Sequence, residues 1–245
     1  INYSPLATNE NGSCQYDDGS EKSHDRRCID IDGNEYKTVR IGNRIWMAEN
    51  LKTTHYRNGQ EIPSRITESR WEGISYGAFA VYNDDPTNAD IYGNLYNWYA
   101  VDDGRGICPD SFHIPTDGEW MELESNIGMS ESELNDTRYR GTNQGSQLAG
   151  NADLWNPENQ DWYRDQLKKN TAFGASNFDA LPGGYRHPSG SYNELGISSF
   201  FWTSTLFEHL FPSALYRNLD YESAEVLRDR FDKRFGFSIR CVGDD

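Results

Sequence analysis

Hydrophobic and polar residues alternate most regularly in two short segments near residue 40. Residues 35–41 (EYKTVRI) and 44–48 (RIWMA) alternate broadly between polar and apolar side chains in the manner of half-buried β-strands. Gly42 and Asn43 separate the two segments, and this kind of residue pair favours a tight turn. The pattern predicts a β-hairpin, with an earlier turn at Gly33 and Asn34.

Helical spacing is clearest after residue 115. Thr116 and Glu119 form a capping box, in which each side chain bonds the backbone of the other. The apolar residues that follow recur at helical intervals: Trp120, Leu123 and Ile127. Ser130 and Glu133 repeat the cap pattern and predict a short second helix. The aromatic-rich residues 92–100 fit either a strand or a short helix.

After residue 139 the chain is rich in glycine and loop residues, and regular alternation returns late. We expect strands at residues 200–203, 214–219, 225–230 and 237–242. Two early helices followed by a late antiparallel sheet describe a loop-rich α+β domain.

Residues 206–235 break this regularity, because no single period places all their aromatic side chains in a core. The segment mixes aromatic and polar residues: Phe207, His209, Phe211, Tyr216, Asp220, Tyr221, Asp229, Phe231, Asp232 and Phe235. Aromatic and mixed polar groups on a rigid scaffold are typical of a binding face. The alternative is that the phenylalanines of this segment form a satellite core under long loops.

The amino-acid composition limits the classes of partner that the chain can bind. The 245 residues include 23 Lys and Arg against 39 Asp and Glu, a net charge of −16. This charge opposes phosphate-dominated contacts, so nucleic acid and anionic lipid are excluded as partners. No apolar run approaches the ~18 residues that cross a membrane, and the chain starts at Ile1 without a signal peptide. We expect a soluble mature piece of a protein, whose signal peptide was either cleaved or is not part of this sequence.

Four cysteines are present, and none forms the C-x-x-C pair of a zinc site. We predict disulfides between Cys14 and Cys28 and between Cys108 and Cys241, which require an oxidising compartment. The alternative is four buried thiols in a cytosolic protein. Residues 1–27 are polar and aperiodic and are predicted to be a tail or linker. The domain is then residues 28–245.

Catalytic and metal motifs are weak. The five histidines lack H-x-x-x-H or H-E-x-x-H spacing, and the acidic residues are scattered, so a hydrolase has no support. The densest oxygen clusters are residues 30–34 and residues 83–85 with Asp90. Neither completes a known calcium loop, although a structural calcium ion stays an option.

Several segments, in one order, resemble the Fibrobacter succinogenes major paralogous domain. They are residues 33–42, 46–52, 92–98, 108–109, 114–116, 181–186, 201–205 and 236–242. The resemblance runs from about residue 30 to residue 243. It implies a fold related to C-type lectins and formylglycine-generating enzymes, in an extracellular or surface-anchored protein, for example a lipoprotein, of Bacteroidetes-like bacteria. The calcium-dependent sugar signatures of C-type lectins are absent.

Some domains of this fold are rewritten by diversity-generating retroelements, which mutate adenines in a template. The C-terminal segment resembles such a variable protein, with framework at Arg217, Leu219, Ala224, Val226, Arg228, Lys233 and residues 236–242. The residues proposed to bind ligand are Phe207, His209, Phe211, Tyr216, Asp220, Ser223, Leu227, Asp229, Arg230, Phe231, Asp232, Arg234 and Phe235.

The sequence thus predicts a non-catalytic extracellular module that binds a protein or glycan on a cell or phage-host surface through residues 206–235. A formylglycine-generating type of oxidase would instead use Cys108 and Cys241 as reactive thiols. A third reading is a structural cell-envelope module without a specific ligand.

Overall fold

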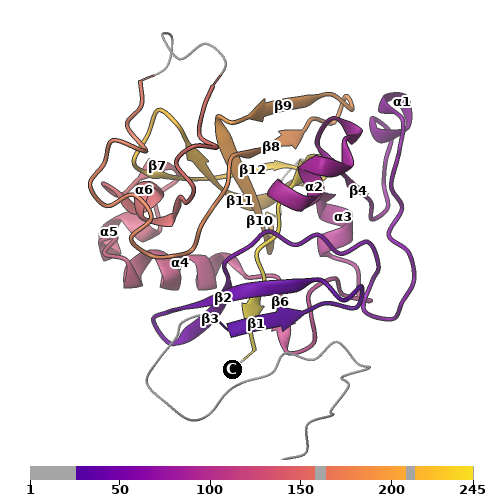
Figure 1. Cartoon of the computed structure of the whole chain (residues 1–245), viewed down its shortest axis with the longest axis horizontal. Helices are drawn as coiled ribbons and strands as arrows, with labels where there is room; N and C mark the ends of the chain where they lie inside the picture. The colour runs from indigo at the N-terminus through magenta and orange to yellow at the C-terminus, as the bar shows by residue number, and fades with distance from the viewer. Residues whose placement is uncertain (1–25, 158–163, 208–212, 245) are drawn as a thin grey trace, which may run out of the picture.

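The computed structural model describes residues 26–157, 164–207 and 213–244, which form two β-sheets with helices at their flanks (Figure 1). The smaller sheet has five strands in the order β1-β2-β3-β14-β6. These strands are β1 (Arg26–Ile29), β2 (Glu35–Ile41), β3 (Arg44–Met47), β14 (Val242–Gly243) and β6 (Phe112–His113). Strand β1 begins before the expected domain start at Cys28.

The predicted hairpin is confirmed as β2 and β3, which pair in antiparallel register from Thr38–Met47 to Ile41–Arg44. Gly42 lies in the turn with a φ of 62°, a left-handed conformation that glycine adopts without steric cost. The alternation buries Val39 and Trp46 on one face, while Arg40 and Asn43 stay exposed.

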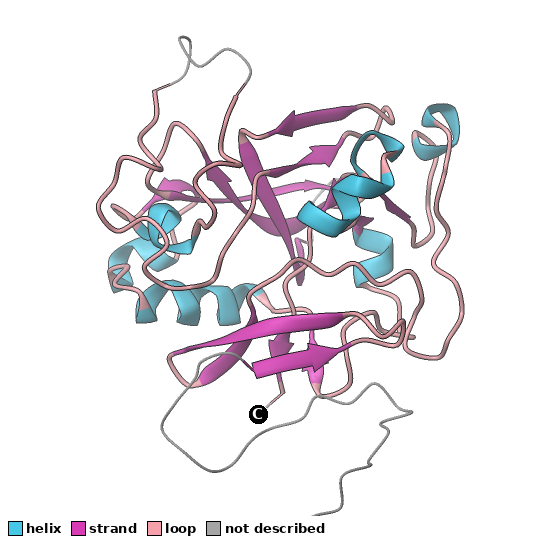
Figure 2. Ribbon diagram, viewed as in Figure 1, coloured by secondary structure: helices cyan, strands magenta, loops and turns pink. Residues whose placement is uncertain are grey.

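The larger sheet carries nine strands in the order β4-β5-β13-β8-β10-β11-β12-β7, with β9 paired to β8 (Figure 2). Their bounds are β4 (Phe79–Ala80), β5 (Leu95–Asn97), β7 (Arg138–Arg140), β8 (Gly183–Arg186), β9 (Tyr192–Leu195), β10 (Ser198–Phe207), β11 (Ser213–Asp220), β12 (Val226–Asp232) and β13 (Gly236–Phe237). The late sheet is antiparallel from β10 through β11 and β12 to β7, as predicted, but β8 pairs with β10 in parallel.

Helices are more numerous than the two predicted. The described residues contain α1 (Glu68–Trp71), α2 (Pro86–Tyr92), α3 (Trp98–Val101), α4 (Asp117–Asn126), α5 (Glu131–Leu134), α6 (Gln144–Leu148) and the 3₁₀ turn η1 (Tyr82–Asp84). The capping box of Thr116 and Glu119 at α4 is confirmed, as is the short helix after Ser130. Residues 92–100 contain both predicted alternatives, because β5 is followed directly by α3. The missed helices span seven residues or fewer, too short to display a helical period.

The predicted strand at 237–242 is wrong as a single element. Gly236–Phe237 pairs in the large sheet and Val242–Gly243 in the small one, so the intervening residues cross between the sheets. Arg240 fixes this crossing: its fully buried guanidinium donates to Asn50 Oδ1 at 2.6 Å and to the carbonyls of Met47 and Asp179 at 3.1 and 2.7 Å. Burial lowers the pKa of Arg240 to about 9.

The predicted bridge between Cys108 and Cys241 is present, with a Cα–Cα distance of 6.0 Å, and it ties the β5–β6 connection to the crossing segment. Cys28 is buried. Its proposed partner Cys14 lies outside the described residues, as does most of the predicted tail, so both stay predictions. No helix in the described ranges has the length and apolar character needed to cross a bilayer.

Candidate binding face

The predicted binding segment centres on the antiparallel pair β11–β12. Their register places Asn218 opposite Leu227, Tyr216 opposite Asp229, and Ala214 opposite Phe231. Because side chains alternate across a strand, these residues share one face of the sheet. Arg217 and Arg228, also opposite each other, lie on the other face. The segment therefore has a front and a back with different chemistry.

Stacked rings dominate the front. The ring of Phe231 lies 4.9 Å from Tyr216 and 4.4 Å from Phe235, with interplanar angles of 7° and 10°. Tyr216 and Phe235 are buried, at 4% and 8% exposure, whereas Phe231 is 37% exposed. The outer ring of the stack thus rests on two rings that belong to the core.

Neighbouring strands extend this stack. Tyr185 of β8 contacts Phe200 and Phe235 with ring distances of 5.0 and 5.7 Å, and Tyr139 of β7 pairs with Leu227. Tyr139 is 43% exposed. We call this surface the aromatic face, formed by Tyr139, Tyr185, Phe200, Tyr216, Leu227, Phe231 and Phe235.

Carboxylates border the aromatic face. Burial raises the pKa of Asp220, although it accepts hydrogen bonds from Ser198 Oγ at 2.9 Å and the Glu222 backbone at 2.8 Å. Burial likewise raises the pKa of Glu194, with a smaller contribution from the charge of Asp220. Burial and then the charge of Asp229 raise the pKa of the Tyr216 hydroxyl. The face is therefore acidic as well as aromatic.

Ion pairs hold the back of the sheet against α4. The Arg217 guanidinium bonds Asp117 and Glu124 at 2.7 Å each, and Arg140 reaches the other oxygen of Glu124 at 2.8 Å. Arg228 bonds the second oxygen of Asp117 at 2.7 Å. Burial alone would raise the pKa of Asp117, but the two arginines outweigh it and lower that pKa to about 2. We call these five residues the ion-pair network.

The other residues predicted to bind ligand do not join the aromatic face as one patch. Arg230 lies on the back of β12, with its guanidinium 4.2 Å from the centre of the Phe207 ring. Asp232, the last residue of β12, forms an ion pair of 2.8 Å with Arg234 in the turn that follows. Ser223 accepts a bond from the Glu225 backbone at the β11–β12 turn. His209 and Phe211 lie outside the described residues.

Sequence reasoning missed four contributors to this surface: Tyr139, Tyr185, Phe200 and Glu194. Tyr185 lies in residues 181–186, which are quoted above only for the family resemblance. Strands β7 and β9 are too short for an alternating pattern to identify them. Their placement depends on which strands pair, which the local sequence does not encode.

Comparison with known families identifies the frame that carries this face. The model of the Fibrobacter succinogenes major domain family matches residues 39–243, well over half of the chain. The chain belongs to the Fibrobacter succinogenes major domain family. No curated protein and no solved structure matches the chain.

The motif residues quoted above for the Fibrobacter succinogenes major domain occupy structural positions. Trp46 and Trp202 are fully buried, and Trp202 donates its indole N–H to the Tyr96 carbonyl at 3.0 Å. Asn50 bonds the Tyr92 carbonyl at 2.7 Å and also accepts from Arg240. Of these residues of the Fibrobacter succinogenes major domain, Trp202 supports the aromatic face from the core, where its ring lies 6.4 Å from Tyr216. Tyr185, in the quoted segment 181–186, belongs to the face itself.

In this Fibrobacter succinogenes major domain, carboxylate oxygens of the two clusters at residues 30–34 and 83–85 accept hydrogen bonds from other residues of the chain. Asp30 accepts bonds from the Asn34 backbone and the Tyr36 hydroxyl, at 3.0 and 2.6 Å. Asp84 accepts from Tyr192 at 2.7 Å, and Asp85 caps α2 through Thr87. Over the described residues, no group of three or more His, Cys, Asp or Glu side chains is arranged to hold a metal ion.

Proposed function

We propose that the chain is a non-catalytic, extracellular ligand-binding module whose recognition surface is the aromatic face. One observation carries the proposal: a partly exposed ring, Phe231, stacks in parallel on core rings of a sheet that buried ion pairs fix from behind. Such a ring is already ordered, so binding through it costs little conformational entropy. The Cys108–Cys241 bridge supports an oxidising compartment.

The chemistry of the aromatic face favours a protein ligand over a glycan. Aromatic rings that are ordered and half exposed serve as anchors in protein interfaces. The carboxylates of Asp220, Asp229 and Glu194 complement Lys or Arg side chains, and the net charge of −16 would steer a basic partner toward the chain. We therefore infer a partner on a cell or phage-host surface that presents a basic and partly apolar patch.

Photo-cross-linking tests this proposal. A photoreactive phenylalanine is placed at position 231 and, in separate samples, at position 139 and at the control position 31, where Ile31 is 40% exposed in the turn between β1 and β2. After exposure to an envelope extract of the bacterium that carries the gene, a product is expected at 231 and 139 only. Unlabelled chain should compete for it, and the Phe231→Ser variant should not.

Absence of a product at 231, or the same products at 231 and 31, would contradict this function and leave a structural envelope module as the better reading. The formylglycine-type oxidase would be favoured if Cys108 and Cys241 reacted with a thiol reagent in the native protein. Both are bonded to each other and buried, at 2% and 0% exposure.

We further propose that the fold is C-type-lectin-like and that retroelement mutagenesis diversifies the aromatic face. The two-sided sheet supports this idea, because the framework residues Arg217 and Arg228 lie behind it and Leu227, Asp229 and Phe231 in front. Sequencing the DNA near the gene tests it. A near-copy of the codons for residues 206–242 that differs almost only at adenines is expected, and the lack of such a copy would refute diversification.

A further inference from the structure

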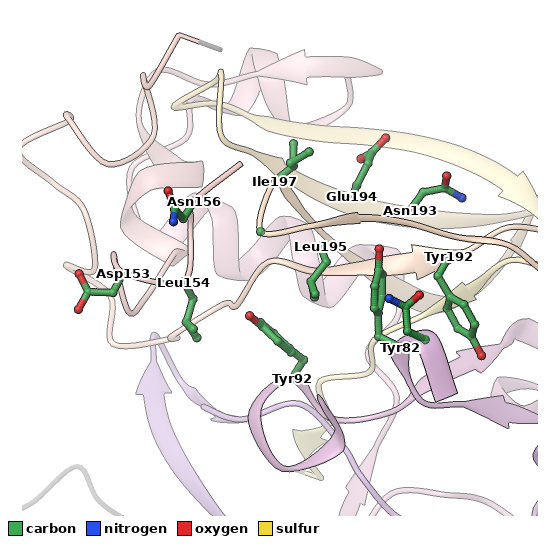
Figure 3. Close-up of a pocket in the computed structure, with 12 residues that line it drawn as sticks. Tyr82, Tyr92, Asp153, Leu154, Asn156, Tyr192, Asn193, Glu194, Leu195 and Ile197 are labelled. Carbon is green, nitrogen blue, oxygen red and sulfur yellow. The ribbon is translucent and has the colours of Figure 1, made fainter. Parts of the chain in front are cut away.

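A cavity lies between β9, α2 and residues 153–156 (Figure 3). Its volume of about 640 Å³ falls within the range of about 300 to 1,000 Å³ that small-molecule sites occupy. Figure 3 shows Leu195 pointing toward Tyr92, while Glu194 points to the other side of its strand. The cavity therefore adjoins the aromatic face at Glu194, which lines the cavity and also borders that face, whereas the proposed function uses none of the other lining residues.

Three tyrosines supply its aromatic walls. Tyr82 and Tyr92 are 8% and 9% exposed, and Tyr192 is half-buried. The rings of Tyr82 and Tyr192 are 5.4 Å apart and inclined by 49°, so they form an angled wall and not a slot for one flat ring. The hydroxyl of Tyr192 donates to Asp84 at 2.7 Å, which fixes that ring.

Gly183 and Gly184 of β8 allow this arrangement. A Cβ on Gly184, whose φ is 61°, would lie 2.9 Å from the Tyr82 ring and would overlap the Asn193 carbonyl. A Cβ on Gly183 would approach the Cβ of Tyr92 to 3.3 Å. The glycine pair thus provides the surface against which two of the three tyrosines pack.

Amide side chains from three segments complete the lining: Asn83, Asn156 and Asn193. Asn83 and Asp84 both have left-handed backbones, with φ of 54° and 55°, which costs energy in residues other than glycine. An amide offers both donors and an acceptor, as a pair of neighbouring hydroxyl groups does. Among the described residues, the lining contains no Lys, Arg or His, and it includes the carboxylates of Asp153 and Glu194, so it disfavours anions.

We propose that this cavity binds a neutral saccharide of one to three units, without a metal ion. Sugars present apolar C–H faces that pack on tyrosine rings, together with hydroxyl groups that pair with amides. The angled walls and the lack of a cationic side chain argue against a flat aromatic ligand and against a phosphorylated or acidic one. This site shares Glu194 with the border of the aromatic face but is built from other rings and amides, so the chain would carry two recognition surfaces.

Saturation-transfer NMR and calorimetry with the 245-residue chain test the site. The probes are maltotriose, cellotriose, mannotriose and N-acetylglucosamine trimer, at millimolar concentration and with a chelator present, and galacturonic acid trimer is the charged comparison. At least one neutral probe should bind, and the acidic trimer should not. Binding by none of the four neutral probes, or equal binding of the acidic one, would overturn the proposal.

Matched variants locate the binding. Asn83→Gly removes one amide while keeping a residue that accepts φ of 54°, and Asn156→Ala removes another from an exposed position. Each should weaken binding by about tenfold, the effect of one hydrogen bond of ordinary strength. The exposed control Asn58→Ala and the face variant Phe231→Ser should not change it. Loss of binding in Phe231→Ser with retention in Asn83→Gly would place the sugar on the aromatic face and refute the cavity site.

Discussion

Removing one carboxylate from the ion-pair network should destabilise the fold far more than removing an exposed one. Glu124 is fully buried, and its oxygens accept bonds from Arg217 Nε at 2.7 Å and from Arg140 Nη2 at 2.8 and 3.0 Å. The Glu124→Gln variant keeps the shape but removes the charge. It also turns an amide N–H₂ toward a guanidinium that needs an acceptor.

The expected magnitude follows from what the two arginines lose. Arg140 is 3% exposed, and its remaining side-chain contact is the sulfur of Met129, while Arg217 keeps Asp117. Removing one partner from a buried ion pair typically costs about 3 to 5 kcal/mol, because a desolvated charge is left uncompensated. We expect the free energy of unfolding of Glu124→Gln to fall by this amount.

Urea denaturation followed by tryptophan fluorescence measures this loss, with Glu122→Gln as the matched control. Glu122 lies on the same helix, is 40% exposed at its side chain and bonds Arg44 at 2.8 Å, so its neutralisation should cost about 0 to 1 kcal/mol. A loss below about 1 kcal/mol in Glu124→Gln would refute the assignment of the network as a desolvated structural unit. A triple variant with Leu at 124, 140 and 217 should recover part of the loss, because it removes the uncompensated charges.

Three further predictions test other parts of the structure. The Cys108→Ala/Cys241→Ala variant should lose about 5 kcal/mol of unfolding free energy, because the bridge closes a loop with a sequence separation of 133. Chemical denaturation under non-reducing conditions measures this loss, and an unchanged denaturation midpoint would contradict it. The pKa of Asp117 is lowered to about 2, so its ion pairs stabilise the fold above its ordinary pKa of 3.8 and lose that effect as the pH falls through about 2. Acid titration should therefore show a loss of about 2 kcal/mol in the free energy of unfolding, which the Asp117→Asn variant should not show. An equal loss in the variant would refute the role of Asp117. Phe231→Ser should lower the free energy of unfolding by about 1 kcal/mol because the ring is partly exposed, whereas Tyr216→Ser should lower it by at least about 3 kcal/mol because that ring is buried. Equal losses in thermal unfolding would contradict the distinction between the outer and inner rings of the stack.

The sequence predicts those elements whose signals are local. The hairpin was predictable because alternation and the Gly42 turn both lie within 35–47, and α4 because its capping box consists of adjacent residues. The crossing at 236–243 was not, because all eight residues are buried and Arg240 draws its partners from two distant segments, residues 47–50 and residue 179. Alternation alone cannot indicate that one strand pattern belongs to two sheets.

The same limit applies to the candidate site. Alternation correctly places Tyr216 and Asn218 on one face, opposite Arg217. It does not indicate that Phe231 of the next strand covers Tyr216, or that Tyr185 and Glu194 arrive from β8 and β9. The degree of exposure is therefore a property of the strand order, which no single segment contains.

The two faces of the β11–β12 pair differ in their contribution to stability and in their proposed role in recognition. On the back, the network of Arg140, Arg217 and Arg228 with Asp117 and Glu124 needs every partner, so a change at any one is costly. On the front, Phe231 and Tyr139 contribute less to the core, because more than a third of each side chain is exposed. If the aromatic face binds a ligand as proposed, substitutions at these outer positions should change which ligand it binds while the sheet stays in place. If the surface is diversified, the tolerated positions should follow side-chain exposure, with Phe231 and Leu227 varying freely and Tyr216 and Phe235 restricted to large apolar or aromatic residues.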